Sequence, residues 1–397
     1  MVDSVVGSWP AVAYEQRTWE PAREVRDSFG PLRASSGPYR AAVVPLLEDR
    51  AIPLSTETTT FATDATAELI RFDTEHARSP LPLAELLLFA EGTSSSAIER
   101  VTSTAQAIAL AQIDESLEPA AGEIAGNIRA VAAAIERAGS LGENMLVDIQ
   151  RMLTASTRPE RRGRWRDQQV WIGGGANAPY RAAFVPPHQT RVADLMADLM
   201  QFARRRDLPA LAHIAVCHAQ YETIHPFLEV NGRTGRAFMQ AMLRRADITR
   251  SIAVPLSAGL LQDTAAYFDA LTRYRSGHVD PIVAVFSRAA FTAVANSNQL
   301  VDDLTVVEHG WAERNTSREG SAARRLTALL QYRPVVNARA AIHYLGVTAP
   351  NVQLAIDRLV GDGILTQIGS GRRNRTWAAR GIIDALDAFS ERTRRGR

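Results

Sequence analysis

The sequence predicts a mainly helical protein with one internal β-hairpin and a winged helix-turn-helix near its C-terminus. Three observations lead to this fold class. Apolar residues recur at helical spacing over most of the chain after Asp64, a central segment alternates around glycines as hairpins do, and the last part shows the helix and strand order of a winged helix. The 397 residues, of which 46% are hydrophobic, are enough for roughly two or three domains with sizeable cores.

The helical patterns begin after an irregular N-terminal stretch. Residues 1–60 carry scattered proline and glycine and no long periodic pattern, so we expect an arm with short helices that wraps the rest. Residues 165–187 alternate around three glycines and end at two prolines, which predicts the hairpin. The main helical patterns cover 83–94, 121–138, 191–204, 208–222 and 232–245.

Charge is unevenly distributed along the chain. All 45 basic residues are arginine, which excludes mechanisms that need a lysine, such as a P-loop or a Schiff base. From Ser321 onward, 13 arginines and 5 acidic residues give a net charge of +8, whereas the 32 arginines and 38 acidic residues before it give −6. A basic C-terminal module on an acidic body suggests that nucleic acid binds at that end.

We predict four parts and a cytoplasmic location. No apolar run approaches the ~20 residues of a membrane helix, and the N-terminus lacks the pattern of a signal peptide, so we expect no membrane contact. The single cysteine, Cys217, cannot form an internal disulfide. The predicted parts are a helical N-terminal region over 1–120, a catalytic core over 121–315, the winged helix over 321–380 and a basic tail over 381–397 with a flexible end at 392–395.

The most informative segment is His225-Pro-Phe-Leu-Glu-Val-Asn-Gly-Arg-Thr-Gly-Arg236, between two helical patterns. His225 can act as a base near neutral pH, and Glu229 is an oxygen ligand suited to Mg²⁺. The helix that starts at Asn231 offers N–H groups to an anion, and Arg233 and Arg236 lie three residues apart near that end. Taken singly, these features are ordinary turn residues and solvated arginines. Their order and close spacing favour a site that transfers part of a nucleoside triphosphate.

This segment resembles the signature of the Fic family, His-Pro-Phe-x-Asp/Glu-Gly-Asn-Gly-Arg-x-x-Arg. The preceding helix, 218–224, and the hairpin from Arg164 are also similar to parts of that family, so the resemblance covers roughly residues 35–300. It implies a Fic-type helical core with a β-hairpin flap. It also implies that ATP donates AMP to a Tyr, Ser or Thr hydroxyl of a target protein, with release of pyrophosphate. The chain itself is one candidate target.

The resemblance implies a role for each residue of the motif. His225 would deprotonate the target hydroxyl, Phe227 would anchor the loop in the core, and Glu229 would bind Mg²⁺. The flap would hold the target segment by strand addition, although a plain surface ribbon is the alternative. The implied nucleotide-binding residues are Val230, Asn231, Gly232, Arg233 (β-phosphate), Thr234, Gly235 and Arg236 (γ-phosphate), with Tyr267 and Phe268 at the adenine. For Tyr267 and Phe268, a place in a helix core is an equally favoured alternative.

Val230 departs from the family pattern, which has glycine at this position. If the turn requires a positive φ there, a β-branched residue is strained, and its methyl groups crowd the phosphates. The valine keeps its N–H, so the anion site is not abolished. The departure leaves the catalytic rate and the type of transferred group open.

A second short motif concerns regulation. Ser95-Ser-Ala-Ile-Glu-Arg100 resembles the inhibitory motif of the family, Ser/Thr-x-x-x-Glu-Gly/Asn. The resemblance implies that Ser95 and Glu99 belong to an inhibitory segment in which Glu99 pairs with Arg236 and keeps the γ-phosphate from binding productively. Arg100 replaces the usual glycine or asparagine. A serine-rich helix end is the alternative.

Two further histidines precede the motif. His213 and His218 are five residues apart and therefore diverge on a helix, and the chain has neither a His-Glu-x-x-His pattern nor paired cysteines. We expect no zinc site and interpret both as hydrogen-bonded helix histidines.

The C-terminal module carries helix caps and a glycine-centred strand pair. Asn337 is predicted to cap a short helix that ends near Tyr344, and Thr348 to cap a second helix that ends near Val360. A strand pair should surround residues 369–375. The candidate DNA-binding residues are Asn351, Gln353 and Arg358 on the second helix and Arg372, Arg373 and Arg375 on the wing. The alternative is a winged helix used for protein contacts, including a homodimer.

Our leading hypothesis is therefore a protein adenylyltransferase that uses ATP and Mg²⁺ and is autoinhibited by Glu99. One alternative is a DNA-binding transcriptional regulator in which Val230 weakens the Fic core, which then senses nucleotides. Another is a Fic core that transfers a different phosphate-bearing group. The sequence leaves open the target protein, the residue type modified and the oligomeric state.

Overall fold

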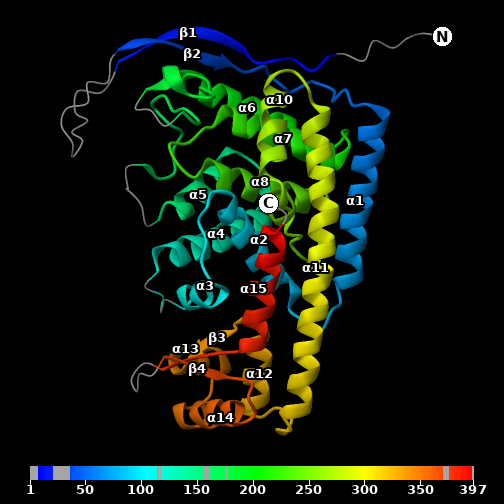
Figure 1. Cartoon of the computed structure of the whole chain (residues 1–397), viewed down its shortest axis with the longest axis vertical. Helices are drawn as coiled ribbons and strands as arrows, with labels where there is room; N and C mark the ends of the chain where they lie inside the picture. The colour runs from blue at the N-terminus through cyan, green and yellow to red at the C-terminus, as the bar shows by residue number, and fades with distance from the viewer. Residues whose placement is uncertain are drawn as a thin grey trace. The chain divides into compact units, whose positions relative to one another are not determined.

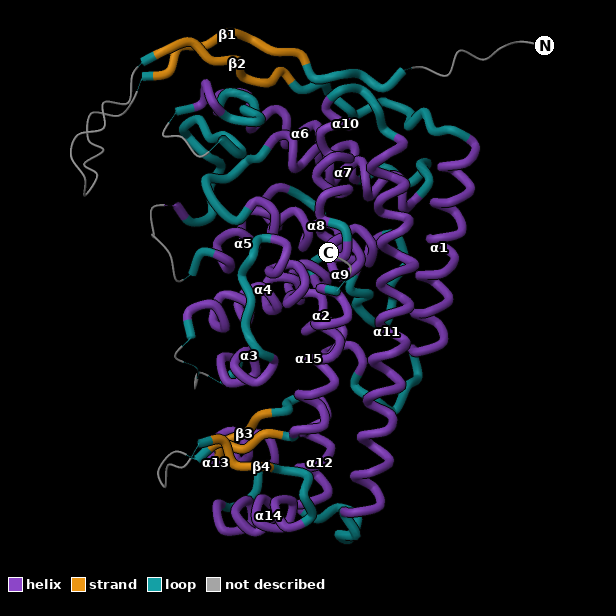
Figure 2. The backbone as a smooth tube through the Cα atoms, in the orientation of Figure 1, coloured by secondary structure: helices purple, strands orange, loops and turns teal. Residues whose placement is uncertain are grey.

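A computed structural model of the chain describes residues 8–20, 36–113, 116, 118–155, 161–174, 178–369 and 375–395 (Figure 1). The protein is mainly helical with small antiparallel sheets, as predicted (Figure 2). Within this described part, no helix combines the length and the apolar character needed to cross a bilayer. Contacts between residues divide the chain into a first unit (Met1–Thr63, Arg137–Met242 and Ala265–Phe286) and a second unit (Asp64–Glu136, Leu243–Thr264 and Ser287–Arg397), which we describe separately.

The first unit contains the helices on either side of the His225 motif. The helical patterns expected over 191–204, 208–222 and 232–245 are confirmed within a few residues. The helices of this unit are α5 (Glu143–Leu153), α6 (Val192–Ala203), α7 (Ala210–Ile224), α8 (Asn231–Arg245) and α10 (Thr264–Arg275), and α1 (Thr56–His76) and α11 (Asp280–Arg314) contribute residues to both units.

The expectation of short helices over residues 1–60 is wrong for the described residues 8–20 and 36–55. Strands β1 (Ala13–Trp19) and β2 (Gly37–Val43) instead form an antiparallel pair, side by side in Figure 1. Tyr39 and Ala41 of β2 are buried in a cluster with Val185, and the Ala42 N–H donates to the Val185 carbonyl at 3.0 Å. The apolar partner of these strands lies more than a hundred residues away in sequence, so the local pattern could not reveal it.

Among the described residues 165–174 and 178–187, the predicted hairpin is reduced to one antiparallel bridge between Ile172 and Phe184. The Ile172 N–H donates to the Phe184 carbonyl at 2.9 Å, and the Phe184 N–H donates to the Ile172 carbonyl at 3.2 Å. A short 3₁₀ helix, Pro179–Arg181, takes the place of a second ladder. Gly174 has φ +86°, and a Cβ there would lie 2.2 Å from the Arg181 carbonyl oxygen, so the turn needs glycine.

The second unit is built around α2. The Cβ of any residue at Gly92 would lie 2.5 Å from the Ile128 side chain, which shows how closely α2 and α4 approach. The fully buried Glu91 accepts hydrogen bonds from the backbone N–H and the hydroxyl of Ser257. The predicted helices over 83–94 and 121–138 are confirmed. The helical body of this unit consists of α2 (Leu83–Ile98), α3 (Ala105–Ala111), α4 (Pro119–Glu136), α9 (Leu256–Gln262) and α15 (Arg380–Arg394).

The C-terminal elements follow the predicted order. Asn337 caps the first short helix, because its Oδ1 accepts from the Ala340 N–H at 2.7 Å. Thr348 is the N-cap residue of the next helix but makes no side-chain capping hydrogen bond. The elements are α12 (Ala322–Tyr332), β3 (Val335–Asn337), α13 (Ala338–Leu345), α14 (Ala349–Gly361), β4 (Thr366–Ile368) and β5 (Thr376–Ala378), and the sheet order is β3-β5-β4.

The basic segment expected over 381–397 is helical for most of its length, and the expected flexible end at 392–395 is wrong up to Arg394. Residues Arg380–Arg394 form α15, in which Ile382, Leu386 and Phe389 are buried. The Arg392 guanidinium donates to Asp303 on α11 at 3.0 Å. The basic residues of this segment belong to a helix that also has an apolar face. A count of charges along the sequence does not reveal that face.

Gly259 on α9 tests the packing of the second unit. A Cβ at this position would lie 2.1 Å from the backbone oxygen of Ala289 on α11, and a backbone atom cannot move aside at low cost. Gly259→Ala should therefore lower the free energy of unfolding by about 1–3 kcal/mol in denaturant melts. Gly122→Ala on α4 is the matched control, because no atom lies within 4 Å of its Cβ. It should stabilise the protein by up to about 1 kcal/mol, and equal effects of both changes would contradict the described packing.

Candidate functional site

The His225 motif forms the loop between α7 and α8, as predicted. His225 is the C-cap of α7 with φ +51°, and α8 begins at Asn231. The Asn231 side chain closes the loop, because Oδ1 accepts from the Phe227 N–H at 2.9 Å and Nδ2 donates to the Phe227 carbonyl at 2.8 Å. Phe227 is fully buried, with its ring centroid 4.8 Å from that of Trp165. The loop is therefore held by its own hydrogen bonds and by a buried ring.

Arg166 is a residue of the site that the sequence analysis missed. It is 3% exposed, and its Nε donates to the His225 carbonyl at 2.8 Å, while its backbone N–H donates to the Pro226 carbonyl at 2.9 Å. The remaining guanidinium nitrogens donate to the carbonyls of Gln168 and Pro187, at the base of the flap. Burial lowers the pKa of Arg166 to about 10, so it stays charged at neutral pH. Arg166 thus connects the flap to the His225 loop.

The surroundings of His225 keep its imidazole neutral. The side chain is 22% exposed, and Nδ1 lies 3.8 Å from Oε2 of Glu222. Burial, and then the positive charges of Arg166 and Arg275, lower the pKa of His225 to about 3, against an opposing hydrogen bond to the Glu222 backbone. A neutral imidazole is the form that can accept a proton.

The first turn of α8 presents backbone N–H groups and two arginines. The Val230 carbonyl accepts from the Thr234 N–H at 3.0 Å and from the Thr234 hydroxyl at 2.9 Å. The amides of residues 231–233 precede this first helical bond, so the helix itself supplies no acceptor for them. Arg233 and Arg236 are 7% and 2% exposed, which rules out a solvated arginine face. This helix end therefore combines backbone donors with two buried cations.

Gly235 and His218 show how closely α7 and α8 pack. A Cβ at Gly235 would lie 2.8 Å from the Tyr221 ring. His218 is fully buried, with Nδ1 3.2 Å from the Gly235 carbonyl oxygen and Nε2 2.7 Å from the Tyr267 hydroxyl. His213 Nε2 lies 2.9 Å from the Phe202 carbonyl oxygen. Both histidines are thus hydrogen-bonded within the helical core.

The aromatic pair expected at the adenine is split between core and surface. Tyr267 on α10 is 1% exposed, whereas Phe268 is 52% exposed. Their ring centroids lie 5.1 Å apart. An adenine contact by these rings stays a prediction.

Glu229 is the carboxylate at the tip of the loop. Its Oε1 accepts from the Arg161 guanidinium at 3.1 Å, and its side chain is 29% exposed. Among the residues that the structure describes, no group of three or more His, Cys, Asp or Glu side chains is placed to hold a metal ion. One accessible carboxylate still fits Mg²⁺, which is commonly held by one or two carboxylates together with substrate phosphates.

Val230 adopts the left-handed conformation that its family position suggested, with φ +59°. Arg100, which stands where the inhibitory motif has glycine or asparagine, has φ +64°. A left-handed conformation costs a residue with a Cβ roughly 1–2 kcal/mol. Both departures from the family patterns therefore fall on positions where the backbone favours glycine.

The residues that resemble the inhibitory motif lie in the second unit. Ser95 is fully buried in α2, and Glu99 is the C-cap residue of that helix, with its N–H donating to the Ser96 carbonyl at 3.0 Å. Arg236 belongs to the first unit. The pairing of Glu99 with Arg236 stays a prediction.

Several candidate DNA-binding residues are engaged within the module. The side-chain amide of Gln353 donates a hydrogen bond to Asp357 at 2.7 Å and accepts one from Arg375 at 3.2 Å. Arg358 forms an ion pair with Asp362 at 3.0 Å. Asn351 is exposed near the start of α14. Arg372 and Arg373 lie outside the described residues. DNA binding by this module stays a prediction.

The strain at Val230 can be measured by comparing two substitutions. Val230→Ala keeps the left-handed penalty, whereas Val230→Gly removes it, so the glycine variant should be more stable by about 1 kcal/mol in free energy of unfolding. The control pair is Leu354→Ala and Leu354→Gly on α14, where the side chain is 68% exposed. There the order should reverse, with alanine more stable by about 1 kcal/mol. The same order at both positions would contradict a strained Val230.

Comparisons with known proteins identify the family of the motif-bearing segment. Residues 140–243 match the model of the Fic/DOC family. "Protein adenylyltransferase Fic" of Nematostella vectensis is 26% identical over 158 residues, which are 39% of this chain and 33% of that protein. The protein of the same name in Drosophila willistoni is 28% identical over 141 residues, 35% of this chain and 25% of the relative. The chain thus matches a third or less of the length of these relatives.

The fold supports the same assignment. The crystal structure of a Fic family protein from Desulfovibrio desulfuricans G20 aligns with a TM-score of 0.51 and 19% identity, over 83% of this chain and 98% of that chain. At this identity the likeness concerns the fold alone. Together with the family match, it leads to one conclusion: residues 140–243 of this chain form a domain of the Fic/DOC family.

Proposed function

We propose that the chain is a protein adenylyltransferase, which moves AMP from ATP to a Tyr, Ser or Thr hydroxyl of a target protein. The observation that carries this proposal is the position of a neutral His225 at the end of α7, beside the N–H groups and buried arginines that begin α8. The relatives named protein adenylyltransferase support the same reaction class.

The proposed reaction is an in-line displacement at the α-phosphorus. His225 accepts the hydroxyl proton, and the target oxygen forms a bond to the α-phosphorus. The bond from that phosphorus to the oxygen bridging the β-phosphate breaks, and pyrophosphate leaves with its electron pair. Because bound ATP adds negative charge beside His225, it raises the pKa of the imidazole and makes it a stronger base.

The phosphates have distinct partners in this proposal. The backbone N–H groups of residues 230–232 surround the α-phosphate, while Arg233 binds the β-phosphate and Arg236 the γ-phosphate. Glu229 would hold Mg²⁺, which offsets phosphate charge when it is bound. The Asn231 side chain, which bonds Phe227 twice, fixes the loop that presents these N–H groups.

The flap around Ile172 and Phe184 is the proposed binding site for the target segment. In the part of the flap that the structure describes, one bridge leaves most of the backbone outside a regular ladder, which is compatible with strand addition by a target chain. Arg166 would keep this flap in position relative to His225, because it bonds carbonyls of both segments.

The reaction is tested by incubating the purified chain with Mg²⁺ and ATP labelled at the α- or the γ-phosphate. We expect label on protein from the α-phosphate only. His225→Ala should lower labelling by ~10²–10⁴-fold, the usual contribution of a positioned base, while ATP still binds. His278→Ala, at an exposed histidine, is the matched control and should label like the parent. Equal labelling by a folded His225→Ala variant would contradict the role of His225.

Autoinhibition is the second part of the proposal. If Glu99 pairs with Arg236, it competes with the γ-phosphate for that guanidinium. Glu99→Gly and Glu99→Gln should then raise labelling at least about tenfold, which corresponds to the loss of one charge-assisted hydrogen bond. Glu136→Gln, at an exposed glutamate of α4, is the control for a general charge effect. If neither Glu99 variant labels faster than the parent, Glu99 has no inhibitory role.

The strained backbone at Val230 supports a second candidate function. In this alternative, the chain is a DNA-binding regulator whose Fic core senses nucleotides without transferring AMP. The labelling experiment separates the two. ATP binding without α-phosphate labelling, even after Glu99 is replaced, would favour the regulator.

A further inference from the structure

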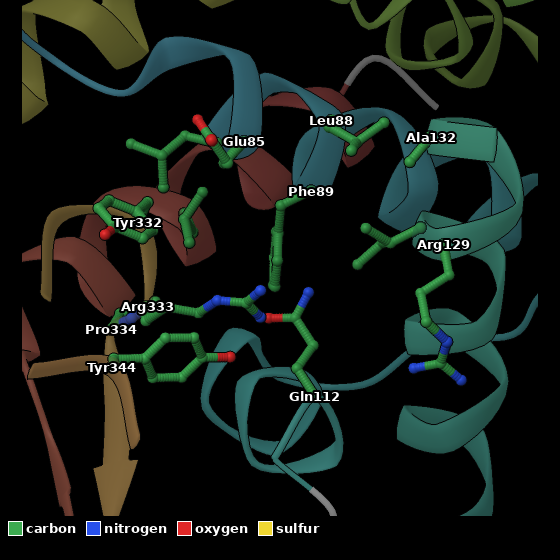
Figure 3. A pocket seen from close by; sticks show the side chains of 13 residues that line it. Glu85, Leu88, Phe89, Gln112, Arg129, Ala132, Tyr332, Arg333, Pro334 and Tyr344 are labelled. Carbon is green, nitrogen blue, oxygen red and sulfur yellow. The ribbon is translucent and has the colours of Figure 1, made fainter. Parts of the chain in front are cut away.

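The second unit contains a cavity of about 290 Å³ between its helical body and its winged-helix elements (Figure 3). Side chains of α2 and α4, with Gln112 just after α3, line one part of the cavity. The end of α12, the two residues that follow it, α13 and α15 line the rest. A volume near 300 Å³ is at the small end of the range for ligand pockets.

Two guanidinium groups reach this cavity from different elements. Arg129 comes from α4, and Arg333 follows α12. In Figure 3, Arg333 extends toward the Gln112 side chain, and Arg129 lies across the cavity. Among the described residues that line the cavity, Glu85 is the one acidic residue, so their ionised side chains sum to a net charge of +1. A single oxyanion would match this charge, because a guanidinium group binds a carboxylate or a phosphate through two hydrogen bonds.

Aromatic rings accompany the charges. Phe89 is buried, while Tyr332 and Tyr344 are 38% and 45% exposed. These exposed fractions are high for such large aromatic side chains. The Arg333 guanidinium carbon lies 5.6 Å from the centroid of the Tyr344 ring. Figure 3 shows Phe89 and Tyr344 on opposite sides of the Arg333 guanidinium. A flat ring placed here would contact aromatic faces while its anionic group reached an arginine.

We propose that this cavity is a binding site for a small aromatic oxyanion, a planar ring that carries one carboxylate or phosphate. The positive net charge favours an anionic ligand, and the aromatic side chains favour a ligand with a planar ring. The volume limits the ligand to a small molecule. The site is separate from the His225 motif, and the proposal does not depend on the proposed transfer reaction.

Such a ligand would contact two parts of the unit at once. Phe89 lies on α2, the helix that also carries Ser95 and ends at Glu99. Tyr344 lies on α13, which precedes α14 of the winged helix. The bound molecule would therefore stabilise the packing of the winged-helix elements against α2.

The test is isothermal titration of the full chain with benzoate, indole-3-carboxylate and phenyl phosphate. Benzyl alcohol supplies a ring without charge, and acetate supplies a charge without a ring. At least one aromatic oxyanion should bind more tightly than both controls, and the carboxylates and phenyl phosphate together show which oxyanion is preferred. Arg129→Ala and Arg333→Ala should each weaken that binding at least about tenfold, the effect of one charge-assisted hydrogen bond.

Arg339→Ala is the matched control, because Arg339 is exposed on α13 and does not line the cavity. It should leave binding unchanged. Tyr344→Ala removes a ring without changing charge and should also weaken binding, which covers the case in which an arginine variant fails to fold. The proposal is wrong if no aromatic oxyanion binds more tightly than benzyl alcohol and acetate, or if Arg339→Ala weakens binding as much as Arg333→Ala.

Discussion

A buried guanidinium needs hydrogen-bond acceptors around it, and Arg166 finds them in the backbone carbonyls of two loops. This one requirement fixes the base of the flap and the His225 loop relative to each other. The same charge, together with burial, keeps His225 neutral, since both lower its pKa. The position of the candidate base thus depends on Arg166, and its protonation state depends on burial together with the charges of Arg166 and Arg275.

The sequence could predict those features whose cause is local. The periodic apolar residues of α4, the capping side chain of Asn337 and the glycine turns near the flap all act within a few residues. The prediction was wrong for β1 and β2, because their apolar partner Val185 is distant in sequence. It also missed Arg166, which is one arginine among several between residues 161 and 166 and whose carbonyl partners become visible only in three dimensions.

The two family motifs show how a backbone angle explains a sequence pattern. Val230 and Arg100 occupy the positions where the motifs have glycine or asparagine, and both have positive φ. A glycine at such a position therefore meets a conformational requirement of the backbone. In this chain the requirement persists while the residue has changed, so the strain is retained in the folded protein.

The two hydrogen bonds between Asn231 and Phe227 also bear on the thermodynamics of ligand binding. A loop that is already closed loses its conformational entropy when the protein folds, and not when a ligand arrives. The amides at the start of α8 are then a preformed surface. The affinity of a ligand for such a surface would reflect contacts and desolvation, with little contribution from ordering of the loop.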